Sequence, residues 1–262
     1  MRRKRLAAYL IMVGISATRG HAIAETQGVH SAAQLGAQIR KLEASWDDPN
    51  WDQHLTHKHI QTLITEYVTN QLNEGAYARQ TLEENLTDVI HEGMWRSWSE
   101  HPARVLFCCS GVPRNYIVSF ALDEAAGGST SVIQVYELGH GSWRLAAEGG
   151  SEMDGCDMDV LLLPSAAGDM RIFAHGLIFG ANQDPTLGAL YGFSGGHIRM
   201  IWKMKNTLGL TARRQDDKLV LEYRDTQLFY KHSLPDAFQD IYTQTDDGLK
   251  LVSHKHLLWD RQ

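Results

Sequence analysis

The sequence predicts a mainly β fold, α+β overall, in which short N-terminal helices precede repetitive antiparallel four-stranded meanders. Two observations support this fold class. From Ser31 to about Ser99 the apolar residues recur with the period of an α-helix. Beyond Pro102 apolar and polar residues alternate, and turn-forming residues recur about every 8 to 12 positions, as in antiparallel sandwiches, barrels and propellers. We therefore expect a helical segment at 25–101 and a β domain at 102–262.

The first 24 residues are typical of a secretory signal peptide. Four basic residues at positions 2–5 precede the apolar run Leu6–Ile15, which is shorter than the ~20 residues that span a bilayer. Ala22 and Ala24 supply the small side chains that signal peptidase requires before its cut. We therefore expect export to the periplasm or the extracellular space, with no membrane span once the signal is removed.

The charge of the chain argues against nucleic acid as a partner. The 262 residues carry a formal net charge of −6. Loss of residues 1–24 removes five basic residues and no acidic one, which lowers the formal charge to −11. A surface of this sign repels phosphate backbones, so the sequence favours a protein or a polymer of another kind as partner.

The three cysteines leave two interpretations open. Cys108 and Cys109 are adjacent, and Cys156 is the only other cysteine. In an oxidising compartment one of the adjacent pair could bond to Cys156. Three buried free thiols fit the sequence equally well, because cysteine packs as a small hydrophobic side chain.

Three amphipathic helices are expected in the helical segment. We expect the first to end near Trp46, the second to start after Thr56 as its N-cap, and the third to begin near Thr81. The spacing of Thr81 to Glu84 fits a capping box. The inward stripes are Leu35, Ile39 and Leu42, then Ile60, Leu63, Ile64, Tyr67, Val68 and Leu72, then Leu82, Leu86, Val89 and Ile90.

Twelve strands are expected in the β domain, each bounded by turn-forming residues. They are 105–109, 116–122, 131–138, 142–148, 159–163, 170–180, 187–193, 197–203, 208–213, 218–224, 238–244 and 249–256.

Three hairpins of the β domain share one pattern. Their sequences are VYELGHGSWRL, LYGFSGGHIRM and IYTQTDDGLKL, and their tyrosines are Tyr136, Tyr191 and Tyr242, which are 55 and 51 residues apart. A meander of about 50 residues that repeats in this way resembles a β-propeller blade. Three units are fewer than the four to eight that close a propeller ring. A partial propeller, a twisted sandwich and a barrel all stay open.

One of these hairpins contains the serine-hydrolase spacing G-x-S-x-G at Gly192, Ser194 and Gly196. A nucleophile of that kind sits between a strand and a helix, whereas the residues after Gly196 alternate like a strand. Ser194 is therefore expected in a hairpin turn, and we assign no catalytic residue.

An acidic stretch at 152–159 is a candidate calcium site. Asp154, Asp157 and Asp159 supply hard oxygen ligands, and Gly155 turns the backbone. The stretch is similar to the D-G-x-x-D loops of calcium-binding propeller repeats, although its spacing to Asp159 is one residue longer. A solvated acidic turn is the favoured alternative, because Asp and Gly are ordinary turn residues.

His254 and His256 are a candidate site for Zn²⁺ or Cu²⁺. Their i, i+2 spacing on a strand points both rings to one face of the sheet. A metal site needs at least a third ligand, and Asp260 is the nearest candidate. Surface histidines without a metal are the favoured alternative.

These observations favour an exported, soluble binding protein without catalytic activity. Its β domain would present loops to another envelope or secreted protein, or to a surface polymer. The alternative is a metal-dependent secreted hydrolase that uses Ca²⁺ or Zn²⁺ at the 152–159 loop or at His254 and His256. An inhibitor of a secreted enzyme is a third interpretation that the sequence does not separate from the first.

Overall fold

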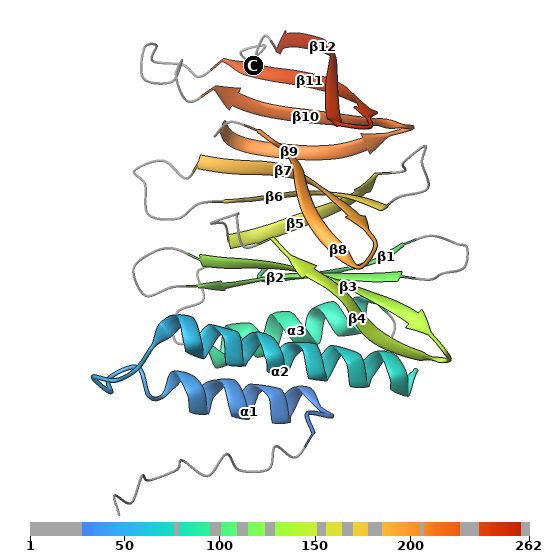
Figure 1. Ribbon diagram of the computed structural model, residues 1–262. Coiled ribbons are helices and arrows are strands. Elements are labelled where there is room, and N and C mark those ends of the chain that lie inside the picture. The colour runs from blue at the N-terminus through green and yellow to red at the C-terminus, as the bar shows by residue number, and fades with distance from the viewer. Residues whose placement is uncertain are drawn as a thin grey trace, which may run out of the picture.

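The computed structural model describes most of the chain outside its N-terminus (Figure 1). The predicted signal peptide lies outside the described residues, and so do Cys109, Asp154, Gly155 and Asp260. The described residues are 28–75, 79–94, 101–108, 115–123, 129–150, 156–163, 170–177, 185–204, 207–225 and 236–257.

Three helices form the first layer. They are α1 (Ala32–Glu43), α2 (Gln53–Glu74) and α3 (Arg79–Gly93). A capping box between Ser31 and Gln34 starts α1, where each side chain bonds the other residue's backbone N–H. Gly75 ends α2 in the left-handed conformation, at φ 67°. In the described part of the chain no helix is long and apolar enough to cross a lipid bilayer.

The predicted start of the second helix is wrong. The N-cap of α2 is Asp52, whose carboxylate accepts the backbone N–H of Leu55 at 3.0 Å, so Thr56 lies inside the helix and is buried. The third helix begins at Arg79, two residues before Thr81 and therefore near its predicted start. Asp and Thr are both good N-cap residues, so the sequence does not distinguish Asp52 from Thr56. The position at which the backbone enters the helix selects Asp52.

Twelve strands follow in the described residues, and each overlaps a predicted strand. They are β1 (Ala103–Cys108), β2 (Asn115–Asp123), β3 (Ser129–Gly139), β4 (Ser142–Gly149), β5 (Cys156–Leu163), β6 (Met170–Leu177), β7 (Pro185–Ser194), β8 (His197–Lys203), β9 (Thr207–Gln215), β10 (Lys218–Asp225), β11 (Ala237–Thr245) and β12 (Gly248–Leu257). The predicted mainly β fold with short N-terminal helices is confirmed.

Sequential antiparallel pairing makes three meanders, β1–β4, β5–β8 and β9–β12. The second and third meanders are joined into one sheet by a short antiparallel contact of β7 with β9, where Thr186 pairs with Thr207. Among the described strands β1 pairs with β2 alone and β12 with β11 alone. The described strands therefore form an open arrangement and not a closed ring.

The layers follow one another in chain order, from the helices to β12 (Figure 1). One buried cluster joins the helices to the first meander, a second joins the first meander to the second, and a third joins the second meander to the third. On β7, Ala189 and Tyr191 belong to the second cluster, whereas Leu190 belongs to the third. Alternate residues of one strand thus pack against layers on opposite faces.

The three repeated tyrosines all face the preceding layer. Tyr136 packs against the helices, Tyr191 against the first meander and Tyr242 against the second meander. The helical layer therefore stands where a preceding meander would stand for β1–β4.

The turns of two repeated hairpins use residues with positive φ. Gly195 and Gly196 connect β7 to β8 at φ 57° and 78°, and His140 and Gly141 connect β3 to β4 at φ 52° and 83°. Two positive φ values in a row match the right-handed twist of paired strands. Ser194 pairs with His197 across the first of these turns, so the prediction that Ser194 lies at a hairpin turn is confirmed.

Candidate functional site

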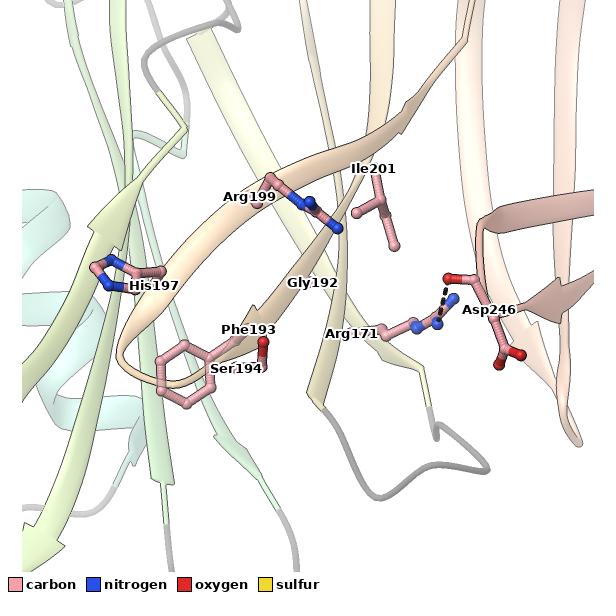
Figure 2. Close-up of a pocket in the computed structure, with 8 residues that line it drawn as sticks. All are labelled: Arg171, Gly192, Phe193, Ser194, His197, Arg199, Ile201 and Asp246. Atoms are coloured by element: carbon pink, nitrogen blue, oxygen red, sulfur yellow. Dashed lines mark hydrogen bonds between the residues drawn. The ribbon is translucent and has the colours of Figure 1, made fainter.

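A pocket of about 340 Å³ lies between the β7–β8 hairpin and the β11–β12 turn (Figure 2). It brings together residues that are far apart in the sequence, because the second and third meanders pack against each other there. Its lining is Arg171, Gly192, Phe193, Ser194, His197, Arg199, Ile201 and Asp246.

Arg171 of β6 forms the floor of this pocket and is only 7% exposed. Its guanidinium donates to the backbone oxygens of Thr245, Asp246 and Gly248, the last two at 3.2 and 3.4 Å. Figure 2 shows the Asp246 bond, which is made by the backbone oxygen of that residue. These bonds fix the β11–β12 turn to β6 and hold the Arg171 charge in one place.

Arg199 of β8 supplies a second positive charge. It is exposed, and its side chain extends from β8 into the space above Arg171 (Figure 2). Among the described residues neither Arg171 nor Arg199 forms an ion pair with a carboxylate. The pocket therefore presents two guanidinium groups, and the Asp246 carboxylate in its lining forms an ion pair with neither of them.

The candidate calcium ligands are only partly described. Asp157 and Asp159 lie in β5, which starts at Cys156, three residues before its predicted start. The Asp159 carboxylate lies 3.6 Å from Arg104 Nε and 3.8 Å from His175 Nε2. Asp159 is thus on a strand, in contact with cationic or basic side chains, and the calcium site itself stays a prediction.

The contacts of Asp159 belong to a larger cluster of charged side chains that lies between the helices, the first meander and the second meander. Arg104 of β1 also bonds Glu83 of α3 at 3.1 Å, and the same Glu83 accepts the backbone N–H of Val105 at 2.7 Å. The His175 side chain is 12% exposed, and burial lowers its pKa, opposed by Asp159 and assisted by Arg104. This cluster ties the helices to the first and second meanders.

His254 and His256 lie together, as their spacing predicts. The Phe238 ring lies 5.1 Å from the His254 ring and 5.3 Å from the His256 ring, measured between centroids. His254 Nδ1 lies 2.5 Å from Asp240 Oδ1, and His256 Nε2 lies 3.0 Å from Asp236 Oδ1. Each imidazole therefore uses one of its nitrogens to contact an aspartate.

Sequence reasoning missed Asp240, which is the centre of this second candidate site. Its side chain is 5% exposed, and Oδ2 accepts the hydroxyls of Tyr223 and Tyr242 at 2.9 and 3.0 Å. An alignment of the repeated hairpins could have pointed to Asp240. Asp240 precedes Tyr242 by two residues, as Gln134 precedes Tyr136, and the Tyr136 hydroxyl donates to Gln134 in the same way.

The structure does not bring all the predicted ligands to one place. Asp159 contacts Arg104 and His175, whereas His254 and His256 contact Asp240 and Asp236. Within the described residues no group of three or more His, Cys, Asp or Glu side chains is placed to hold one metal ion. The metal-dependent hydrolase stays a prediction, and both interpretations of the cysteines stay open.

Comparisons with known proteins assign this chain to no family. No protein-family model matches the sequence, and no curated protein matches it. One similar solved structure is a mutant α-L-arabinofuranosidase from Fusarium graminearum in complex with an iminosugar inhibitor. It is 13% identical with a TM-score of 0.37, and the match covers 59% of this chain and 47% of that one, about half its length. A likeness at this TM-score establishes neither a shared fold nor a shared function.

Proposed function

We propose that this protein is an exported, non-catalytic binding protein that holds an anionic group of a surface polymer in the pocket above Arg171. The observation that carries the proposal is the convergence of Arg171 and Arg199 on one pocket without a carboxylate partner in the described residues. Guanidinium groups recognise carboxylate, sulfate and phosphate through paired, charge-assisted hydrogen bonds.

The two arginines have complementary properties for binding. Arg171 is held in place by three backbone oxygens, so little side-chain entropy is lost when a ligand arrives. Arg199 is exposed at the mouth and is free to close on the ligand. Arg171 is the fixed cation and Arg199 the adjustable one. Together they suit a single anionic group, either at the end of a polymer or within it.

The charge of the whole protein narrows the class of polymer. The chain carries a formal net charge of −6, so a densely charged polyanion is repelled by the protein as a whole. A polymer with widely spaced anionic groups suffers less of this repulsion and still offers one group to the pocket. We therefore expect binding to favour sparsely charged acidic polysaccharides.

Calorimetric titration with polygalacturonate of graded methyl esterification tests the proposal, because esterification removes the charge and keeps the sugar chain. We expect the sparsely charged samples to bind and the fully esterified sample not to bind. The number of reducing ends, which measures cleavage of the polymer, should not increase. Arg199→Gln should weaken binding about 10- to 100-fold, since a hydrogen bond to a charged group contributes about 1.5–3 kcal/mol. Arg40→Gln is the matched control, because Arg40 is 51% exposed on α1.

Three results would contradict the proposal. The first is equal binding by the wild type and Arg199→Gln, which would place the anion elsewhere. The second is binding that is unchanged by full esterification, which would show that the carboxylates are not recognised. The third is release of new reducing ends, which would replace the binding function with hydrolysis.

A further inference from the structure

The same position of the repeat carries different chemistry in the three meanders. Two residues before the repeated tyrosine stand Gln134, Ala189 and Asp240, and their partners on the neighbouring strand are Glu148, Lys203 and His254. In the first meander the Gln134 side chain bonds Glu148 and Thr65 of α2 and is fully buried. In the third meander the equivalent pair ends in His254, whose side chain is 51% exposed.

The contacts of Asp240 leave one nitrogen of His254 available. Asp240 Oδ2 accepts two tyrosine hydroxyls, and Oδ1 lies against His254 Nδ1. A buried carboxylate with these partners is an acceptor, so the neutral imidazole holds its proton at Nδ1 and has its lone pair on Nε2. Within the described residues His254 Nε2 makes no hydrogen bond.

His256 also contacts an aspartate through one nitrogen, but it uses Nε2 where His254 uses Nδ1. Asp236 Oδ1 contacts its Nε2, which leaves Nδ1 without a hydrogen bond in the described part of the chain. The Phe238 ring stacks on His254 at an interplanar angle of 18° and also contacts His256. This packing restricts both imidazoles to one face of β11 and β12.

We propose that His254 and His256 form an open site for a borderline divalent metal ion such as Zn²⁺, with Asp240 and Asp236 as the carboxylates that orient them. Imidazole nitrogen is a preferred ligand of Zn²⁺, and a histidine that binds metal almost always donates its other N–H to a carboxylate or carbonyl. The two imidazoles supply only two ligands, and the described residues supply no third, so the third ligand that a tight site needs comes from a bound molecule and water fills the other positions. The inference is independent of the arginine pocket.

Asp240→Asn is the most informative variant. It keeps the shape of the side chain and reverses the direction of the hydrogen bond between residue 240 and His254. The amide oxygen still accepts from Tyr223 and Tyr242, whereas the amide N–H₂ now donates to His254 Nδ1. The imidazole proton then moves to Nε2, where it blocks the metal. Nitrogen NMR of the histidine rings without metal reads this change of tautomer directly.

The experiment is calorimetric titration of the untagged chain with Zn²⁺. We expect the wild type to bind Zn²⁺, His254→Gln and His256→Gln to lose at least about tenfold in affinity, and Asp240→Asn to lose about 10- to 100-fold. His59→Gln is the control, because His59 is an exposed histidine on α2. Circular dichroism of each variant separates lost binding from lost folding.

Three outcomes would overturn the proposal. They are no binding by the wild type at about millimolar Zn²⁺, equal affinity in His254→Gln and the wild type, and unchanged affinity in a folded Asp240→Asn whose tautomer has changed. If Asp240→Asn does not fold, the two histidine variants decide, since exposed side chains tolerate substitution.

Discussion

The Tyr242 hydroxyl donates a hydrogen bond to Asp240 Oδ2 at 3.0 Å, from a position two residues further along the same strand. Residues two apart on a strand share a face, so the phenol lies directly over the carboxylate. Burial, the negative charge of Asp240 and this hydrogen bond raise the pKa of Tyr242, which keeps the phenol protonated as a donor.

Removal of the Tyr242 hydroxyl is therefore expected to destabilise the fold. Tyr242→Phe should lower the free energy of unfolding by about 1–3 kcal/mol, because a buried carboxylate loses one of its donors. Urea denaturation measures the change. Tyr116→Phe serves as the control, since within the described residues the Tyr116 hydroxyl forms no hydrogen bond. Equal stability of the two variants would show that the bond to Asp240 contributes nothing.

His175 is expected to make stability depend on pH below neutrality. Its pKa in the folded protein lies below the usual value of 6.5, chiefly because it is buried. Between the two pKa values the unfolded chain binds more protons than the folded one, so the free energy of unfolding falls as the pH falls. The slope for one proton reaches at most about 1.4 kcal/mol per pH unit.

Urea denaturation between about pH 7.5 and pH 5 tests this linkage, since that window includes the reference pKa of histidine. His175→Gln should remove part of the slope, because glutamine takes up no proton in this range. His140→Asn is a suitable control, as His140 is an exposed turn residue at φ 52°, which asparagine tolerates. Parallel curves for the wild type and His175→Gln would refute the assignment.

Close packing between the second and third meanders is expected to exclude a side chain at Gly188. A Cβ there would lie 2.9 Å from Phe173 Cζ and 3.0 Å from Leu210 Cδ2, and both neighbours are buried. Gly188→Ala should therefore cost about 1–3 kcal/mol in overpacking. Gly192→Ala on the same strand is the control, because its Cβ would approach Ile201 only to 3.7 Å. A Gly188→Ala protein as stable as the control would show that the two meanders pack more loosely.

The strands were predictable because their pattern is local. All of β8 and most of β10 and β12 match their predicted bounds, since alternation and turn residues mark a strand within its own sequence. The N-cap of the second helix at Asp52 was missed because Asp52 and Thr56 are both good caps and only the path of the backbone selects one.

The candidate sites were predictable only in part, for a related reason. The shared face of His254 and His256 follows from their spacing on one strand. Their contacts with Asp240 and Asp236 depend on the register of β11 against β12, and a bulge at Ile241 and Tyr242 shifts that register. Asp157 was expected in a loop because the sequence does not show that β5 begins at Cys156.

By itself the sequence determined the fold class, the order of helices and strands, and the repeated tyrosine hairpin, because each follows from the spacing of apolar and turn residues along the chain. Only the tertiary structure decided that Arg171 would meet a turn 74 residues away and that Asp240 would lie beneath Tyr223 and His254. Such contacts depend on strand register and on how successive layers pack, and neither is encoded in a local period.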